Sequence, residues 1–258
     1  MFPRLTIMRT LRKFSPFLFA SLVAIALPVW SEAQTPPTVA PQAESLLRQA
    51  SQYLQQQKSY RFQAEITFDD VMLPDFKLQY HSTAQVMVRR PQEFRVDYAG
   101  DRRNMNFYFN GKQLTVFDPN ANVYAGLPLP QNIDAALNEM DTNYNFVVPL
   151  ADFIHSDPYQ ALASKIKAGY YLGKSTIGGI STHHLAFSQE NIDWQIWIED
   201  GKLPLPRKLV ITYKNLPGSP QYSAVLSQWE FNPLDSSVFT FTPPSNANSI
   251  EFLPGFKP

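Results

Sequence analysis

The fold is decided by the stretch AQVMVRRPQEFRVDY, residues 84–98, together with NGKQLTVFD, residues 110–118. Apolar residues occupy every second position of residues 84–88 and 94–98, which is the period of a half-buried β-strand. Arg90-Pro91 separates the two runs, because proline has no N–H to donate to a sheet. Asn110-Gly111 is typical of a tight hairpin, whose central residues need a positive φ. The stretch therefore predicts consecutive antiparallel strands.

The same alternation continues before and after this stretch. In residues 60–68 the even positions are apolar and the odd positions are polar. Gly178-Gly179 and Asp200-Gly201 have the composition of further hairpins. The additional strands expected from these patterns are residues 60–68, 78–88, 105–109, 170–172, 183–187, 194–198, 208–213, 222–231 and 239–244.

Helices are expected in two places. Residues 43–57 carry apolar side chains at helical spacing, which form one stripe on a surface rich in Gln and Ser. Residues 132–140 predict a short amphipathic helix, and Asp157-Pro158 favours another helix start because an acidic cap precedes proline at the first helical position. An apolar island, residues 146–154, lies between these two segments. The expected fold class is mainly β with helices (α+β).

The amino terminus has the pattern of a signal peptide. Basic residues up to Lys13 precede a mostly apolar run, residues 17–30, and Ser31-Glu32-Ala33 offers small residues at the cleavage positions. The apolar run contains Pro28 and is shorter than the roughly 20 residues of a membrane-spanning helix. We expect cleavage after Ala33 and export to the periplasm; an uncleaved anchor is the alternative.

Cleavage there divides the chain into three expected parts: a signal peptide (residues 1–33), a proline-rich disordered leader (34–42) and a single domain (43–258). The chain has no cysteine, which excludes disulfides and a lipid-modified amino-terminal cysteine. Without the signal peptide 18 basic and 21 acidic residues remain, a net charge near −3. This balance predicts no nucleic-acid partner.

Motifs of common catalytic sites are missing: the sequence has no Gly-x-Ser-x-Gly, phosphate loop, dinucleotide glycine pattern or His-Glu-x-x-His. His183-His184, near Glu190 and Asp193, is the one candidate metal cluster. Neighbouring residues of a strand point to opposite faces, so a structural or surface role is favoured there. Asp69-Asp70 and Glu199-Asp200 suit strand ends and turns better than a glycosidase pair. We expect no enzyme, catalytic residue, metal or cofactor.

The order of alternating strand, Arg90-Pro91 turn, Phe94 and Asn110-Gly111 hairpin resembles the LolA/LolB-like periplasmic lipoprotein-carrier superfamily, to which the sigma-E regulator RseB is related. More narrowly, it resembles a family of uncharacterised predicted periplasmic proteins. The Phe-x-Phe-x-Pro-Pro ending, residues 239–244, is similar to the superfamily's last strand, so the resemblance covers most of residues 43–253. It implies a curved antiparallel sheet forming an incomplete barrel. Helices within residues 43–57 and 132–166 would cover its concave face.

The resemblance also implies a binding site. In the superfamily an arginine directly before the turn proline bonds the lid and holds the empty state closed, and Arg90 occupies that place. Phe94 matches an aromatic along the path of the acyl chains. The expected ligand-binding residues are Phe62, Ile66, Val86, Arg90, Phe94, Phe107 and Trp194.

The expected function is a periplasmic binding or carrier protein that holds lipid or lipoprotein acyl chains in an apolar concavity. Burial of apolar surface at roughly 25 cal/mol per Å² supplies the binding energy without catalytic residues. The alternative is a structural, interaction or regulatory protein of the cell envelope whose concavity is filled by its own side chains. The expected partners are acyl chains and a membrane in peripheral or transient contact only, and an envelope protein is a further candidate.

Overall fold

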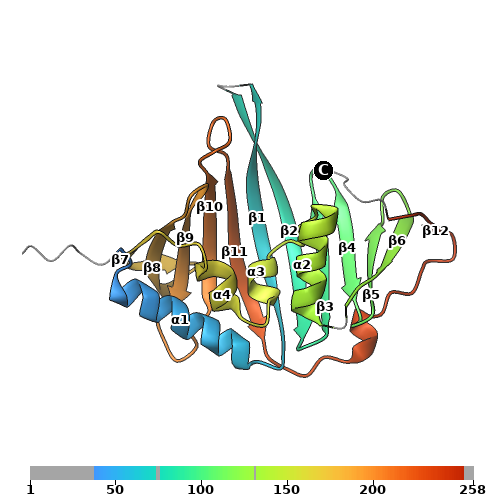
Figure 1. Ribbon diagram of the computed structural model, residues 1–258, viewed down its shortest axis with the longest axis horizontal. Coiled ribbons are helices and arrows are strands. Elements are labelled where there is room, and N and C mark those ends of the chain that lie inside the picture. The colour runs from blue at the N-terminus through green and yellow to red at the C-terminus, as the bar shows by residue number, and fades with distance from the viewer. Residues whose placement is uncertain (1–37, 74–75, 131, 253–258) are drawn as a thin grey trace, which may run out of the picture. The chain divides into compact units, whose positions relative to one another are not determined.

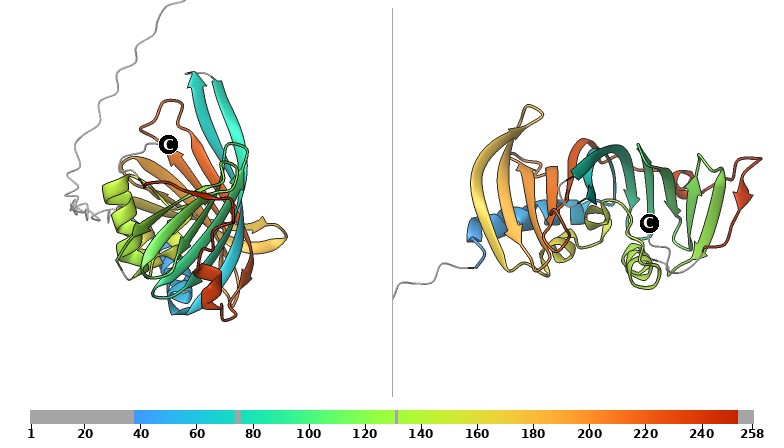
Figure 2. Two further views of the ribbon diagram at one scale, coloured as in Figure 1. Left: turned by 90° about the vertical axis from the view of Figure 1, so that its right-hand side faces the viewer. Right: turned by 90° about the horizontal axis from the view of Figure 1, so that it is seen from above.

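The computed structural model describes residues 38–73, 76–130 and 132–252 (Figure 1), all within one compact unit, Pro36–Pro258. Its centre is a 12-stranded sheet in the order β12-β6-β5-β4-β3-β2-β1-β11-β10-β9-β8-β7. Neighbouring strands are antiparallel except for β12 and β6. The sheet curves without closing, and the helices lie on its concave side (Figure 2). The predicted incomplete barrel is confirmed.

The strands follow the chain almost entirely in meander order. Their bounds are β1 (Ser59–Leu73), β2 (Phe76–Arg89), β3 (Glu93–Gly100), β4 (Asn104–Phe109), β5 (Gln113–Asp118), β6 (Val123–Pro128), β7 (Ala168–Ile177), β8 (Ile180–Ser188), β9 (Ile192–Glu199), β10 (Pro206–Tyr213), β11 (Gln221–Glu230) and β12 (Asn248–Ser249). Because β11 pairs with β1, the sheet is one continuous surface rather than two separate halves.

The central pair β1–β2 is much longer than its neighbours and rises above them (Figure 1). At its base the predicted alternation holds, and Tyr60, Phe62 and Ile66 are fully buried. At its tip the pattern ends: Met72 and Leu73 are 59% and 65% exposed, respectively. The pair therefore belongs to the core at one end and to the surface at the other.

Helix α1 (Pro41–Gln56) lies across β7, β8 and β9 (Figure 1), with Leu47 and Leu54 buried against the sheet. It begins two residues earlier than predicted, because proline at the first helical position is pre-set for the helix. The amide of Ala40 also donates to the carbonyl of Gly169 on β7. Residues 38–42 of the predicted disordered leader are therefore ordered. The predicted signal peptide, residues 1–33, lies outside the described residues.

Three helices follow β6: α2 (Ile133–Tyr144), α3 (Ala151–Ile154) and α4 (Pro158–Ala163). Asn132 and Asp157 cap α2 and α4, each accepting a hydrogen bond from a backbone amide three residues further on. Both predicted helix starts are confirmed, and part of the apolar island becomes α3. Among the helices of the described residues, none combines the length and apolar character needed to span a bilayer.

Two details differ from the sequence expectations. Residues 239–244 form no strand: a 3-10 helix, Ser236–Phe239, precedes an irregular segment, since Pro243-Pro244 cannot donate to a sheet. Phe241 of this segment packs instead against Tyr108 of β4. The Asn110-Gly111 hairpin is present, but residues 110–112 separate β4 from β5 and only Gly111 takes a positive φ, 84°.

Candidate functional site

Two cavities open on the concave face, and both adjoin α3. One, of about 410 Å³, is mainly apolar; the other, of about 550 Å³, is lined largely by polar and acidic side chains. They share three lining residues, Asp152 of α3 with Leu209 and Ile211 of β10. We refer to them as the apolar cavity and the acidic cavity.

The apolar cavity lies between the sheet and the connection from α2 to α3. Phe107 on β4 and Tyr222 on β11 contribute from the sheet, and Phe146 and Leu150 contribute from the connection. Six of the twenty residues that line it are aromatic, and their rings differ in orientation. Phe107 and Phe146, for example, lie 5.6 Å apart at an interplanar angle of 47°.

The mouth of the apolar cavity faces the end of the molecule where the β1–β2 hairpin projects. Val147 and Leu216, which both line this cavity, are 67% and 46% exposed. Leu216 lies in the β10–β11 connection, and this connection contacts the hairpin, where Lys77 donates to the carbonyl of Ser219 at 3.4 Å. Exposed apolar side chains therefore lie at the mouth beside polar ones such as Arg103, and further exposed apolar side chains lie on the hairpin tip.

The acidic cavity lies between α2, α4 and strands β9 and β10. Its wall contains four aspartates, against one lysine, Lys165. The aspartates are Asp134, Asp141, Asp152 and Asp157. Its floor is apolar and includes Trp194 and Ile211. The cavity therefore offers an apolar surface next to an excess of negative charge.

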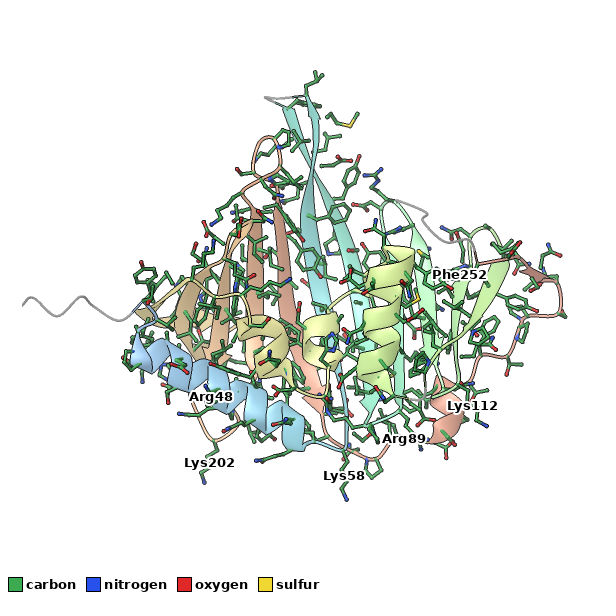
Figure 3. The ribbon with its side chains drawn as sticks, in the orientation of Figure 1. Arg48, Lys58, Arg89, Lys112, Lys202 and Phe252 are labelled. Carbon is green, nitrogen blue, oxygen red and sulfur yellow. The ribbon has the colours of Figure 1, made fainter. Side chains whose placement is uncertain are left out.

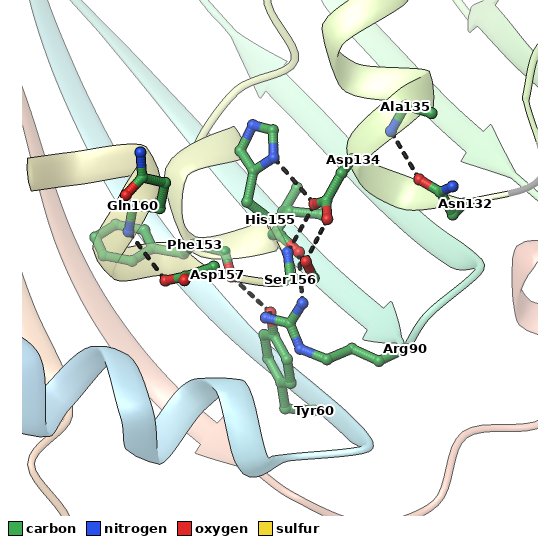
Figure 4. Close-up of polar contacts among 11 residues, drawn as sticks. Tyr60, Arg90, Asn132, Asp134, Ala135, Phe153, His155, Ser156, Asp157 and Gln160 are labelled. Atoms are coloured by element: carbon green, nitrogen blue, oxygen red, sulfur yellow. Dashed lines mark hydrogen bonds and ion pairs between the residues drawn. The ribbon is translucent and has the colours of Figure 1, made fainter. Parts of the chain in front are cut away.

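Arg90, at the end of β2, reaches α3 (Figure 4). Its Nη1 donates to the carbonyl of Ile154 at 3.1 Å, and its Nη2 donates to the hydroxyl of Tyr60 at 3.1 Å. The Tyr60 hydroxyl in turn donates to the carbonyl of Phe153 at 2.5 Å. Burial raises the pKa of Tyr60 to about 12, so this hydroxyl stays a donor at any physiological pH. We call this cluster of Arg90, Tyr60 and the two α3 carbonyls the α3 latch.

A second set of contacts ties α3 to α2 (Figure 4). Asp134 Oδ1 accepts from the amide of Ser156 at 2.8 Å and lies 3.1 Å from His155 Nδ1, while Oδ2 accepts from the Ser156 hydroxyl. Burial alone would raise the pKa of Asp134, but these hydrogen bonds outweigh it and lower the pKa. Asp134 therefore stays ionised and fixes the position of α3 relative to α2.

Several polar atoms around the cavities have no such partner among the described residues. Trp194 is 2% exposed, and its Nε1 makes no hydrogen bond. The buried hydroxyl of Tyr222 makes none either, and burial raises its pKa. Burial also raises the pKa of Asp152, whose carboxylate influences both Tyr213 and Tyr222. Orphaned polar groups of this kind cost stability and mark positions where a ligand can supply the missing bond.

The structure distributes the predicted binding residues over three environments. Phe62, Ile66, Val86 and Phe94 are at most 1% exposed and belong to the packed core, and none lines a cavity. Phe107 and Trp194 belong to the same core, each 2% exposed, but Phe107 also lines the apolar cavity and Trp194 the acidic cavity. Arg90 belongs to the α3 latch. The sequence pattern thus identified the inner face of the sheet, but it did not separate packed positions from open ones.

Asp152 was missed at the sequence level. It stands within the apolar island, where an isolated acidic residue is the signal that could have identified it. Most residues of the acidic cavity were missed as well, because they come from α2, α4 and β9, which are far apart in the chain. Only the folded chain brings them together.

The histidine pair has separate partners. His183 Nε2 lies 3.0 Å from Asp200, whereas His184 stacks on Trp197 with ring centroids 4.0 Å apart. Within the described residues no group of three or more His, Cys, Asp or Glu side chains has the arrangement of a metal site. These contacts hold neighbouring strands together.

A family model described as "Predicted periplasmic protein (DUF2092)" matches residues 43–253. A search of the curated proteins found no match.

Among solved structures, the chain is similar to an uncharacterised conserved protein from Thermus thermophilus, with TM-score 0.48 and 11% identity over 82% of this chain and 99% of that chain. It is similar to the lipoprotein LppX from Mycobacterium tuberculosis, with TM-score 0.46 and 16% identity over 76% of this chain and 98% of that chain. It is also similar to a LolA superfamily protein from Nitrosomonas europaea, with TM-score 0.41 and 16% identity over 77% of this chain and 97% of that chain.

Proposed function

The chain belongs to the family described as "Predicted periplasmic protein (DUF2092)", and on that premise we propose that it binds the acyl chains of lipids or lipoproteins in its apolar cavity and carries them through the periplasm. The protein itself is periplasmic, as its family is. Export through a signal peptide cleaved after Ala33 is part of the proposal. Acyl chains are poorly soluble in an aqueous compartment, so moving them between membranes requires an apolar enclosure.

The observation that carries the proposal is the apolar cavity. Its volume of about 410 Å³ falls within the range of small-molecule sites, roughly 300–1,000 Å³. Covering part of one acyl chain with such a lining removes apolar surface from water at roughly 25 cal/mol per Å² and supplies several kcal/mol. No reacting group is needed for this task.

The α3 latch supplies a means to change the cavity. The connection that follows α2 lines the apolar cavity and leads directly into α3, which Arg90 holds at its carbonyl end. Release of Arg90 would free α3 and this connection to move away from the sheet. In the proposed cycle the latch is closed in the empty protein, and ligand entry displaces it.

The hairpin tip supplies the membrane contact of the proposed carrier. Met72 and Leu73 on β1 are both more than half exposed, as is Phe76, which pairs with Leu73 from β2. Burial of these three side chains in a lipid layer would remove their apolar surface from water. Transient insertion of this tip would bring the cavity mouth to the membrane surface.

The experiment is uptake of a fluorescent fatty acid by the purified mature protein. Met105 lines the apolar cavity and is partly exposed at the edge of the core, so Met105→Glu places a charge in the cavity at less cost to folding than a charge at a fully buried position. Ile180→Glu, at the start of β8 and away from both cavities, is the matched control. Saturable uptake that is lost in Met105→Glu and retained in Ile180→Glu supports the proposal.

Absence of uptake by the wild-type protein would sink the carrier function. It would favour the second candidate, a structural, interaction or regulatory protein of the envelope. That candidate rests on a specific observation: four of the predicted binding residues pack in the core rather than around an open space.

A further inference from the structure

Asp152 lies where the two cavities meet. It lines both, together with Leu209 and Ile211, so a molecule lying in the apolar cavity has one end beside this carboxylate. No Lys, Arg or His among the described residues forms an ion pair with it. A carboxylate in such surroundings costs stability unless a cation joins it.

Further carboxylates near Asp152 also favour a bound cation. The acidic cavity holds Asp141 and Asp157 as well, whereas Lys165 is the only lysine among the described residues that line it. The charge of Asp134 is already engaged by His155 and Ser156. The remaining excess of carboxylates repels an anion and attracts a cation.

Trp194 is an independent sign of a ligand. It is 2% exposed and lines the acidic cavity, and its indole N–H has no acceptor among the described residues. A buried donor without an acceptor is rare in folded proteins. An oxygen atom on a bound headgroup would satisfy it.

We propose that the protein selects amphiphiles whose headgroup combines an ammonium group with an oxygen acceptor. The alkyl chain occupies the apolar cavity, the ammonium group pairs with Asp152, and the oxygen accepts from Trp194. This inference rests on the proposed function and names its ligand class.

The opposite charge preference has weaker support. Arg103 lines the apolar cavity and could attract an anionic headgroup, but it is exposed at the rim. Water and salt screen a charge at that position, whereas Asp152 is less exposed, and electrostatic interactions are stronger there. The interior carboxylate therefore sets the selectivity.

The test compares three probes of equal chain length below their micellar concentrations: N-dodecylethanolamine, protonated at pH 7, dodecanol and dodecanoate. Binding is followed by calorimetry on the mature protein. We expect the cation to bind about tenfold more tightly than dodecanoate, because an ion pair in a partly enclosed site is weakly screened. Asp152→Asn removes this preference. Trp194→Phe weakens the binding of N-dodecylethanolamine about threefold and leaves the binding of dodecanol unchanged.

Asp141→Asn is the matched control, because this exposed aspartate lines the same cavity; its effect is at most about twofold. Two results would overturn the proposed selectivity: equal binding of all three probes, or tighter binding of dodecanoate that Arg103→Gln abolishes. Neither result would overturn the carrier function. Failure of dodecanol and both ions to bind overturns the carrier function itself.

Discussion

The two ends of the β1–β2 pair are built from similar residues and have opposite surroundings. At the base, Tyr60 and Phe62 are fully buried under α3. At the tip, Leu73 and Phe76 are 65% and 53% exposed, and this end of the pair projects beyond the helices (Figure 1). Charged side chains such as Lys58 and Arg89 lie around the base (Figure 3).

This difference separates apolar residues that the core contains from apolar residues that lie outside it. The base follows strict alternation, so one face packs and the other faces water. The tip exposes three large apolar side chains, Met72, Leu73 and Phe76, which adds nothing to the core and promotes aggregation in water. A large apolar side chain that the fold does not need is a candidate for contact with a membrane.

The largest effect expected from this comparison is on stability. Phe62→Ala at the base leaves a cavity beneath Phe153 and Trp229, and we expect it to lower the free energy of unfolding by about 3–5 kcal/mol. Leu73→Ala at the tip should change it by less than about 0.5 kcal/mol. Urea unfolding of both variants measures the contrast; equal losses would mean that the tip is part of the core.

The second effect concerns the α3 latch at the base. Arg90→Ala removes a charged donor from the Ile154 carbonyl and from the Tyr60 hydroxyl. We expect this change to lower the free energy of unfolding by about 1–3 kcal/mol. Hydrogen exchange at the amides of α3 should speed up, and fatty-acid uptake should become faster. Arg89→Ala is the matched control because its contacts, to Glu93 and Leu234, lie outside the latch. Unchanged exchange in Arg90→Ala would show that the latch does not hold α3.

The third effect concerns the tip and the membrane. Replacing Met72, Leu73 and Phe76 by Ser should weaken binding to phospholipid vesicles at least about tenfold, because each 1.4 kcal/mol of lost apolar burial is tenfold. The melting temperature should stay the same. Vesicle flotation measures the binding. The control replaces Tyr170 and Leu172, equally exposed on β7, and an equal loss there would show that the contact is not specific to the tip.

The smallest effect concerns Asp152, between the two ends. Burial raises its pKa in the folded protein above the ordinary value of 3.8, although the charge of His155 opposes this, and Tyr213 and Tyr222 are its other titratable neighbours. Folding therefore penalises the carboxylate at neutral pH, and Asp152→Asn should raise the melting temperature by about 2–4 °C. This gain in melting temperature should shrink as the pH falls through the raised pKa of Asp152, and it should vanish below pH 3.8. A pH-independent gain would point to packing as its cause.

Much of the fold could be predicted from local patterns. Alternation located the base of β1, and Gly178-Gly179 located a two-residue hairpin because both residues take positive φ, 55° and 82°. Asp157-Pro158 located the start of α4. Each of these features depends on residues that are neighbours in the chain.

The candidate site could be predicted only in part. Alternation placed Phe62 and Phe107 on the same inner face, but α3 packs on the first while the second lines an open cavity. Which positions stay open depends on where α2, α3 and their connection lie, and these positions depend on distant contacts such as Arg90 with Ile154. The failed strand at residues 239–244 has the same origin, since Phe241 packs on rings from three separate strands.

The most direct test of the carrier function is native mass spectrometry of the mature protein purified from periplasm without detergent, followed by lipid extraction. We predict a bound species of lipid or lipoprotein mass that disappears in Met105→Glu and persists in Ile180→Glu. A clean apo mass for the wild-type protein, together with no uptake of fluorescent fatty acid, would contradict the carrier function.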